Sequence, residues 1–386
     1  MTATYQKYIL NFRQASGTSR GILQTKETYL LKFEENSKIG IGECAIFRVL
    51  SIDDRPDYEE KLNWLCQNIN ANIDDLLVEL IEFPSIQFGL EQAVLSLKSN
   101  NPFELFPSKF TQSKEAININ GLIWMGSEAF MKQQISDKLE AGFSTIKMKI
   151  GAIDFETELS LLKSIRKDFS SKEIELRVDA NGAFKPNEAL EKLNRLADFE
   201  IHSIEQPIMQ GQINEMAHLC LKTPLPIALD EELIGVFSVT KKQELLQIIN
   251  PQYIILKPSL VGGFHGCEDW ITLAEKQQIG WWITSALESN IGLNAIAQWT
   301  YNLGNKRPQG LGTGRLGSHA VRCRSPKWYP DQRGCAAAKP SWLLPAPVCG
   351  CRGPGCRGPA NSVAPWRSAE HRADAVRPAR KRQALH

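Results

Sequence analysis

The sequence predicts an α/β protein in which a parallel (β/α) barrel follows an α+β domain. From Ala116 onward, strand-like and helix-like segments alternate, which is the pattern of consecutive βα units. Five strands end on charged residues, at steps of 30, 26, 25 and 27 residues along the chain. Because each step accommodates one strand, one helix and two loops, these charges should meet at one end of the barrel. The five strand ends are Lys149, Asp179, Glu205, Asp230 and Lys257.

Residues 1–115 group strands first and helices second, which predicts a separate α+β domain. Tyr8–Phe12 and Glu27–Phe33 have strand composition, and Gly40–Cys44 is typical of a hairpin return. Between the strands, the segment Gly17-Thr-Ser19-Arg20-Gly21 predicts a mobile loop whose arginine can reach an anion. A plain hairpin loop is the alternative. Two helices follow, at Tyr58–Ile73 and Ser85–Ser99, because their apolar residues recur every three or four positions.

Residues 116–314 predict seven or eight βα units. Ser127 and Asp154 are suited to cap the first two helices, and two more helices are expected after Pro186 and at Ile291–Tyr301. A doubly wound open sheet is the alternative, but no glycine-rich phosphate turn follows the first strand. The predicted strands are Ile117–Ile123, Thr145–Ile150, Glu173–Asp179, His202–Glu205, Pro226–Asp230, Tyr253–Lys257, Trp281–Ala286 and a short eighth near Gln309–Gly312.

Residues 315–386 differ abruptly from the rest of the chain. They hold 14 Lys/Arg against 3 Asp/Glu, nine of the 20 prolines and five of the nine cysteines, so the net charge of +2 conceals an acidic body and a basic tail. We interpret the tail as frameshifted or foreign sequence that need not be folded. Its cysteines lack the paired spacing of a zinc site. Nucleic-acid binding through the tail is the least favoured alternative and predicts steep salt dependence.

The body of the chain shows no signal peptide and no apolar run of transmembrane length, and its four cysteines are scattered. We therefore expect a cytoplasmic protein with a small-molecule ligand and neither a membrane nor a nucleic acid as partner. The oligomeric state stays open, with a homo-oligomer as one option.

The strand at Thr145–Ile150 predicts two lysines inside the barrel. Ile146 and Met148 point to the opposite face from Lys147 and Lys149, and the apolar set should pack outward against helices. A buried ammonium group is costly without compensating negative charge. The two lysines therefore imply carboxylates nearby.

Three carboxylates are available at adjacent strand ends: Asp179, Glu205 and Asp230. They would repel one another without a cation, and as hard oxygen ligands without His or Cys they favour Mg²⁺, with Mn²⁺ as a substitute. Asn181 and Glu231 lie close enough in sequence to support them.

This arrangement suggests proton abstraction next to a carboxylate. A divalent cation can hold a substrate carboxylate and take up charge as an enediolate forms, while a lysine removes the α-proton. Each residue taken singly has a structural alternative, such as a turn at Asp179–Gly182. The recurrence of a charged residue at the same point of successive βα units argues against that alternative for the whole set. Ser285 and Glu288 are further candidates for ligand contact, or ordinary loop residues, whereas His202 and His265 are expected to be structural.

Lys147-Met-Lys149, Asp179-Ala-Asn181, Glu205-Gln-Pro207, Asp230-Glu231 and Lys257-Pro258 form an ordered set that resembles the enolase superfamily, in its muconate cycloisomerase-like branch. The resemblance covers residues 1 to about 314. It implies a modified TIM barrel, (β/α)7β, with an N-terminal α+β capping domain. It also implies Asp179, Glu205 and Asp230 as magnesium ligands, and Lys149 and Lys257 as catalytic lysines on opposite faces of the substrate.

Within that branch, local motifs such as Ser285–Gly292 are most similar to the o-succinylbenzoate synthase family of menaquinone biosynthesis. That resemblance implies a lyase in which Lys149 takes the α-proton and then protonates the departing hydroxyl. Lys257 would stabilise the enediolate, while Ser19 and Arg20 would help close the capping loop. Muconate cycloisomerase, N-acylamino acid racemase and dipeptide epimerase stay open as alternatives, although a dipeptide epimerase would normally carry an Asp-x-Asp pair where this chain has Ser285-Ala-Leu-Glu288. An impaired chain is a further alternative, because the tail does not resemble the family's C-terminal segment.

Overall fold

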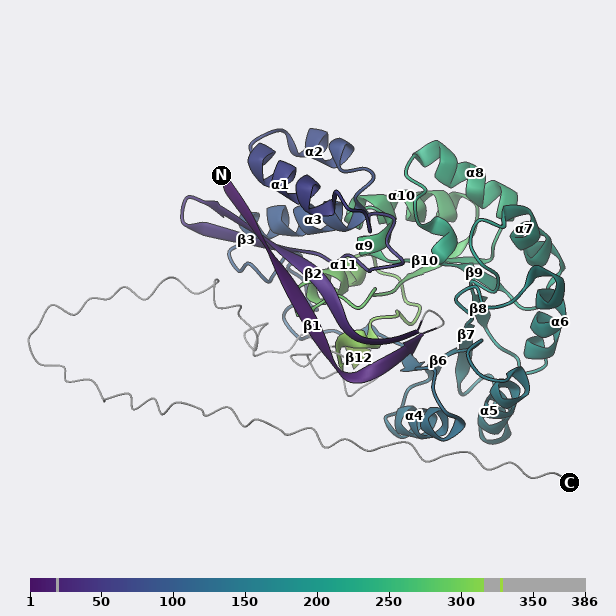
Figure 1. The fold of residues 1–386 in the computed structure, drawn as a ribbon. Coiled ribbons are helices and arrows are strands. Elements are labelled where there is room, and N and C mark those ends of the chain that lie inside the picture. Colours follow the sequence, from purple (N-terminus) through teal and green to yellow (C-terminus); the bar gives the residue numbers. More distant parts are fainter. Residues whose placement is uncertain (19–20, 316–326, 329–386) are drawn as a thin grey trace, which may run out of the picture. The chain divides into compact units, whose positions relative to one another are not determined.

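A computed structural model of the protein describes residues 1–18, 21–315 and 327–328. The described residues 1–315 belong to one compact unit, with the strand-and-helix group of the N-terminal part beside the barrel (Figure 1). Within these ranges, none of the helices combines the length and the apolar character needed to span a bilayer.

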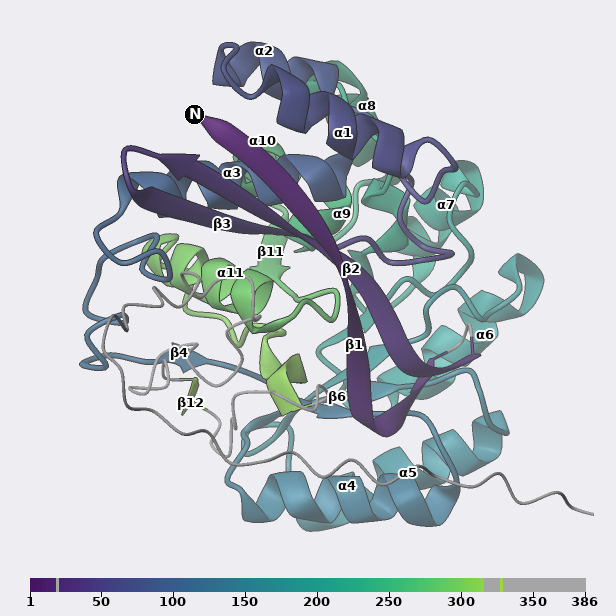
Figure 2. The same ribbon diagram turned by 60° about the vertical axis from the view of Figure 1, so that its left-hand side comes forward.

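The N-terminal domain is a three-stranded antiparallel sheet covered by helices. Strands β1 (Thr2–Thr18), β2 (Gly21–Glu35) and β3 (Lys38–Cys44) are ordered β1-β2-β3, and β1 and β2 form the long ribbon of Figure 2. Apolar residues of β2, such as Leu31 and Phe33, are fully buried in one cluster with Leu62 and Leu65 of the helices. The helices are α1 (Tyr58–Asn68), α2 (Ile73–Glu79) and α3 (Pro84–Lys98).

Helix α3 lies directly on β3, and two glycines allow this contact. A Cβ on Gly42 would lie 1.9 Å from the carbonyl oxygen of Gly89, and a Cβ on Gly40 would lie 2.3 Å from that of Ala93. Both obstacles are helix backbone, so only glycine fits at these two positions. The Gly40–Cys44 segment is a returning strand as predicted, and its glycines also make this close approach to the helix possible.

The second part is a curled parallel sheet with the order β11-β10-β9-β8-β7-β6-β5, which confirms the predicted barrel class. Its helices line the outside of the sheet (Figure 1). The strands of this sheet are β5 (Gly121–Ile123), β6 (Thr145–Lys149), β7 (Glu175–Asp179), β8 (Ser203–Glu205), β9 (Ile227–Leu229), β10 (Tyr253–Leu256) and β11 (Gly280–Ile283). The short strand β4 (Ile117–Asn118) precedes them and is not part of this sheet. The helices are α4 (Glu128–Glu140), α5 (Phe155–Asp168), α6 (Pro186–Ala197), α7 (Ile213–Lys222), α8 (Val239–Ile249), α9 (Pro258–Val261), α10 (Gly263–Lys276) and α11 (Asn290–Asn302), with 3₁₀ turns at Glu231–Leu233 and Gly312–Arg315.

The expected eighth strand is reduced to two bridging residues that join the sheet's two edges. Gln309 bridges Ile119 and Gly310 bridges Thr284, both in parallel orientation. The bond from Gly310 N to Ile283 O is 2.8 Å, and that from Gln309 N to Asn118 O is 2.9 Å. The sheet is thereby closed into a barrel.

Two predicted elements are divided in the structure. The helix expected over Tyr58–Ile73 ends at Asn68, and a new helix begins at Ile73 because the side chain of Asn72 accepts a hydrogen bond from Asp74 N at 2.8 Å. The strand expected over Ile117–Ile123 is interrupted between β4 and β5. The predicted caps Ser127 and Asp154 do accept hydrogen bonds from the first turns of α4 and α5.

The interpretation of residues 315–386 as a frameshifted or foreign tail falls almost wholly outside the described residues. Of that stretch the structure describes Arg315 and the two-residue strand β12 (Lys327–Trp328), which pairs antiparallel with β4.

Candidate active site

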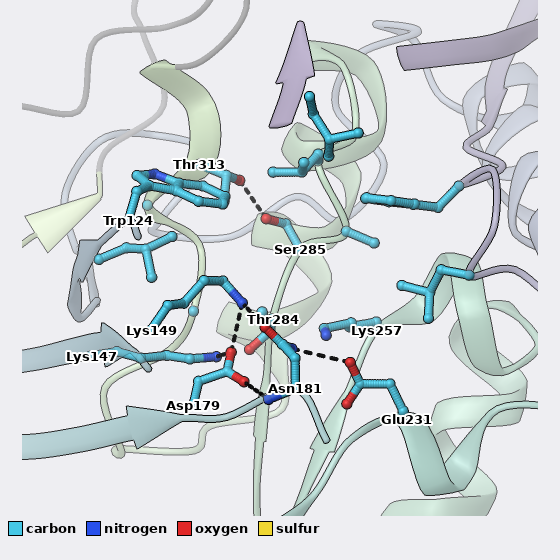
Figure 3. Close-up of a pocket in the computed structure, with 18 of the residues that line it drawn as sticks. Trp124, Lys147, Lys149, Asp179, Asn181, Glu231, Lys257, Thr284, Ser285 and Thr313 are labelled. Atoms are coloured by element: carbon cyan, nitrogen blue, oxygen red, sulfur yellow. Dashed lines mark hydrogen bonds and ion pairs between the residues drawn. The ribbon is translucent and has the colours of Figure 1, made fainter. Parts of the chain in front are cut away.

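A pocket of about 150 Å³ lies over the carboxyl ends of the barrel strands (Figure 3). Its floor carries charged residues from β6 and β7 and from the segments that follow β9 and β10. The walls are largely apolar and include Leu122 and Trp124 of the barrel and Leu23, Phe47, Val49 and Leu50 of the N-terminal domain. A charged floor within apolar walls suits a small organic ligand that carries an anionic group.

Strand β6 presents two lysines to this floor, as its alternation predicts. Ile146 and Met148 are fully buried on the other face, in the cluster shared with the surrounding helices. Lys147 and Lys149 enter the barrel, where their side chains are 8% and 12% exposed. Packing of the apolar set therefore fixes the direction of both ammonium groups.

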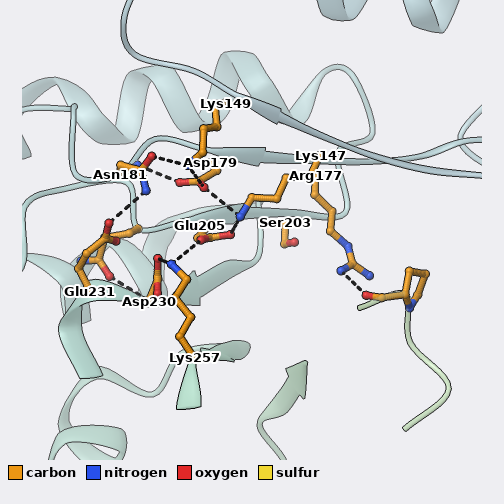
Figure 4. A network of polar contacts seen from close by, with 12 residues as sticks. Lys147, Lys149, Arg177, Asp179, Asn181, Ser203, Glu205, Asp230, Glu231 and Lys257 are labelled. Atoms are coloured by element: carbon orange, nitrogen blue, oxygen red, sulfur yellow. Dashed lines mark hydrogen bonds and ion pairs between the residues drawn. The ribbon is translucent and has the colours of Figure 1, made fainter. Parts of the chain in front are cut away.

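Asp179 at the end of β7 accepts from both lysines (Figure 4). Its Oδ2 atom lies 2.9 Å from Lys147 Nζ and 2.8 Å from Lys149 Nζ. Burial alone would raise the pKa of Asp179, but the charges of Lys147, Lys149 and Lys257 outweigh burial and hold that pKa well below its usual range. Asp179 is therefore a carboxylate at neutral pH.

Glu205 at the end of β8 and Asp230 after β9 continue this group of charges. We call the group the charged row; its members are Lys147, Lys149, Asp179, Glu205, Asp230 and Lys257. Glu205 pairs with Lys147, and Asp230 pairs with Lys257 at the end of β10 (Figure 4). Burial raises the pKa of Asp230 to about 6, against the attraction of Lys257. Burial would lower the pKa of Lys257, but Asp230 and Glu205 outweigh burial and raise it above its ordinary value.

Asn181 links the row to Glu231. Lys149 Nζ donates to Asn181 Oδ1 at 2.7 Å, and Asn181 Nδ2 donates to Glu231 Oε1 at 3.1 Å. Asn181 adopts a left-handed backbone conformation, with φ of 44°, immediately after β7. Asparagine tolerates that conformation better than most residues, which accounts for its place in the turn.

Gln206 fixes the spacing of two neighbouring strand ends, a role that the sequence did not reveal. Its Oε1 accepts from Asp230 N at 3.1 Å and from Glu232 N at 3.3 Å. Its Nε2 donates to Glu232 Oε2 at 3.0 Å. The amide side chain between Glu205 and Pro207 therefore holds the end of β9 in register with the end of β8.

The donor set of the row is compatible with a hard divalent cation. The carboxylates of Asp179, Glu205 and Asp230 are all at most 3% exposed, and Glu205 Oε1 accepts no hydrogen bond from the described residues. As the side chains lie, no three His, Cys, Asp or Glu residues in the described ranges are grouped as a metal cluster. Lysine ammonium groups lie between the carboxylates instead and provide the positive charge.

The other predicted contact residues fall in different places. Ser285 lines the pocket, and its hydroxyl hydrogen-bonds with that of Thr313. Glu288 is absent from the pocket lining, because its carboxylate accepts from Ser259 Oγ and from Ala286 N, each at 2.7 Å. Ser19 and Arg20 lie outside the described residues.

Several pocket residues were missed by the sequence analysis. Phe47–Leu50 come from the turn after β3, where Arg48 is the one charged residue and no motif marks the segment as a ligand contact. Trp124 and Thr313 come from segments that were predicted only as connections, and Asn120 was predicted inside the strand Ile117–Ile123 but lies in its interruption between β4 and β5. The left-handed φ of 70° at Val49 distinguishes this turn, but it is visible only in the structure and not in the sequence.

Comparison with known proteins agrees with this geometry. A sequence model of the family described as enolase C-terminal domain-like matches residues 131–323. The o-succinylbenzoate synthase of Desulfotalea psychrophila is 44% identical over 347 residues, covering 82% of this chain and 94% of the relative. The crystal structure of MenC from the same organism superimposes with a TM-score of 0.74 at 41% identity, over 84% of this chain and 96% of that one.

A more distant structure shares the fold. The dipeptide epimerase of Enterococcus faecalis, complexed with Mg and the dipeptide L-Leu-L-Tyr, superimposes with a TM-score of 0.71 at 19% identity. The superposition covers 83% of this chain and 92% of that one.

Proposed function

The chain belongs to the enolase superfamily, and we propose that it is a magnesium-dependent lyase of the o-succinylbenzoate synthase type. The observation that carries the proposal is the convergence of Lys149, Lys257 and Asp179 at one pocket, in a chain so similar to an o-succinylbenzoate synthase. Glu205 and Asp230 pair with the pocket lysines Lys147 and Lys257. The proposal takes a small carboxylate as the ligand and the cytoplasm as the place of action.

Asp179, Glu205 and Asp230 would hold the magnesium ion. When bound, the ion would orient the substrate carboxylate and stabilise the negative charge that develops on it. The charge of the strand ends supports this assignment. Four carboxylates, including Glu231, stand against three ammonium groups there, which leaves one negative charge in excess before a cation and one positive charge after it. That remaining positive charge would be matched by a substrate carboxylate.

Lys149 would act as the base. Its Nζ atom lines the pocket and is oriented by Asp179 and Asn181, so it can take the proton α to the substrate carboxylate. The same Nζ would then return that proton to the departing hydroxyl, so that the C–O bond breaks, water leaves and the ring becomes aromatic. Lys257 approaches from β10, on another side of the pocket, and its ammonium would stabilise the developing negative charge (Figure 3).

Epimerisation is the alternative that the same geometry supports. Two lysines that reach one pocket from different strands could serve as opposed bases, one removing the proton and the other returning it. In that case the α-carbon would invert and no water would be lost.

Turnover of the cyclohexadiene substrate of o-succinylbenzoate synthase tests the proposal. We expect aromatisation with Mg²⁺, none with chelator, and none in Lys149→Ala. Lys132→Ala is the matched control, since that lysine pairs with Glu128 on the exposed face of α4. Epimerisation of acylated amino acids or dipeptides without aromatisation would favour the alternative. Activity that Lys149→Ala retains would refute the assignment of the base.

The tail is tested in the same assay. A chain ending at Gly314 should match the full chain if residues 315–386 are inert. Lower activity in the full chain than in the shortened one would support the impaired-chain hypothesis.

A further inference from the structure

A buried lysine of the N-terminal domain contacts the loop that follows β11 in the barrel. Lys26 on β2 is 7% exposed, and its Nζ donates to Ala286 O at 2.9 Å, to Leu287 O at 3.2 Å and to Ala45 O at 3.4 Å. An ammonium group has three donors, and three backbone carbonyls use all of them. Lys26 therefore connects its own domain to two successive residues of a pocket-lining loop.

A buried carboxylate of the same domain holds the other end of that loop. Glu43 on β3 is fully buried and accepts from Ser289 N and Gly292 N, each at 2.8 Å, and from the Ser289 hydroxyl. It also accepts from Thr28 Oγ1 at 2.9 Å. The two backbone donors are those of Ser289, the N-cap residue of α11, and of Gly292 in its first turn, where a negative charge is favoured by the free N–H groups and the helix dipole.

The segment between these two anchors has a constrained backbone. Leu287 has a φ of 62°, in the left-handed region that is unfavourable for a bulky residue. Ala286 and Leu287 both line the pocket. Such a conformation persists only where the surroundings hold it, and the Lys26 contacts to both carbonyls supply that restraint.

We infer that Lys26 and Glu43 are positioning residues that shape the active-site pocket from the neighbouring domain. Lys26 holds Leu287 in its left-handed conformation and Glu43 fixes the start of α11, so the wall formed by Ala286 and Leu287 is set by the docking of the N-terminal domain. Neither residue touches the reacting atoms. Their effect should appear in substrate binding more than in the chemical step, a consequence that rests on the proposed function.

Local hydrogen exchange tests the inference without any turnover. In Lys26→Met, which keeps the side-chain length, the amides of Ser289 and Gly292 should exchange at least about tenfold faster, the factor that corresponds to about 1.4 kcal/mol. Amides of α5, the barrel helix that follows β6 rather than β11, should be unchanged. Lys32→Met is the matched control, since Lys32 lies on the same strand and pairs with Glu34 at 2.7 Å. Exchange that rises equally in α5, or not at all in the loop, would overturn the inference.

A double-mutant cycle identifies the mechanism. Glycine adopts the left-handed conformation at little cost, so Leu287→Gly should make Lys26→Met far less consequential. In the native background we expect Lys26→Met to raise KM about tenfold with kcat changed less than about threefold, and in the Leu287→Gly background to change KM less than about threefold. An equal effect in both backgrounds would refute the role assigned to Leu287.

The two proposals can fail separately. If neither the unaltered protein nor the chain ending at Gly314 aromatises the cyclohexadiene substrate, the proposed function is wrong. The role of Lys26 is then still decided by hydrogen exchange, measured in the single variants and in the double-mutant cycle. If Lys26→Met does not fold, Glu43→Gln serves in its place, because it keeps the shape of the side chain and removes the charge at the start of α11. Unchanged exchange at Ser289 and Gly292 in a folded Glu43→Gln protein would overturn the inference.

Discussion

Replacing Asp179 with asparagine should expose how strongly the buried charges of the site depend on one another. The substitution preserves shape and removes one negative charge from a carboxylate that is fully buried and contacts both Lys147 and Lys149. Lys147 would keep only Glu205, and Lys149 would keep only the amide oxygen of Asn181. Removing one partner of a buried ion pair destabilises proteins by about 3–5 kcal/mol. Because the asparagine oxygen can still accept from one lysine, we expect about 3 kcal/mol.

Urea unfolding in chelator and in Mg²⁺ measures both roles of Asp179. In chelator, Asp179→Asn should lower the free energy of unfolding by about 3 kcal/mol. The control Asp137→Asn, on the exposed face of α4, should change the free energy of unfolding by less than about 0.5 kcal/mol. In Mg²⁺ at 100 times its dissociation constant, a bound ion stabilises the native protein by about 2.7 kcal/mol, and the variant should lose most of this gain. The pKa of Asp179 is depressed, so the stability that it contributes is complete above about pH 4 and is lost as the pH falls further.

Two results would refute this reasoning. Equal stability of Asp179→Asn and the unaltered protein in chelator would show that the ion pairs with Lys147 and Lys149 do not stabilise the fold. If Mg²⁺ stabilised the variant against unfolding as much as it stabilises the unaltered protein, Asp179 would not be a ligand of the ion.

Three further predictions follow from other contacts. Lys257→Ala should lower kcat of the proposed reaction by about 10² or more in steady-state kinetics, and a loss below tenfold would contradict its electrostatic role. Burial raises the pKa of Glu158 from 4.5 to about 7, so its ionisation should cost the fold up to about 3 kcal/mol as the pH rises through that interval. Glu158→Gln should therefore gain stability relative to the unaltered protein between pH 5 and pH 8 in chemical denaturation, and a pH-independent difference would contradict the burial argument. Gly42→Ala should destabilise by about 3 kcal/mol because its Cβ would meet the backbone of Gly89, whereas Gly211→Ala, with open space around it, should cost about 1 kcal/mol in the same assay, and equal losses would contradict the packing argument.

The charged row was predictable because its information is local and periodic. The alternation of side chains within β6 determines that Lys147 and Lys149 point into the barrel. The regular repetition of strand and helix places the other charged residues at the same end of the barrel. The observed register places Lys149 beside Asp179 and Asp179 beside Glu205. Residues separated by one βα unit in the sequence are therefore neighbours on adjacent strands of the sheet.

The contacts between the domains could not be predicted in this way. Lys26 and Ala286 are 260 residues apart, and Glu43 and Ser289 are 246 apart. In sequence, Lys26 is an unremarkable charge beside a strand and Glu43 ends a hairpin segment. The partners of Lys26 are backbone carbonyls, which every residue possesses, and Glu43 adds only the hydroxyl of Ser289 to two backbone N–H groups, so no complementary charge marks the other half of either contact.

The same contrast explains how the two halves of the pocket are built. The floor is made by side chains whose charges must compensate one another, so their identities are restricted and visible in the sequence. The wall at Ala286 and Leu287 is made by a backbone conformation, and its restraint comes from the neighbouring N-terminal domain through Lys26. A change of ligand preference can therefore arise from substitutions in the N-terminal domain that leave every charged residue of the floor in place. The chemistry of the barrel and the shape of its pocket depend on different residues, and the loop after β11 is where the two meet.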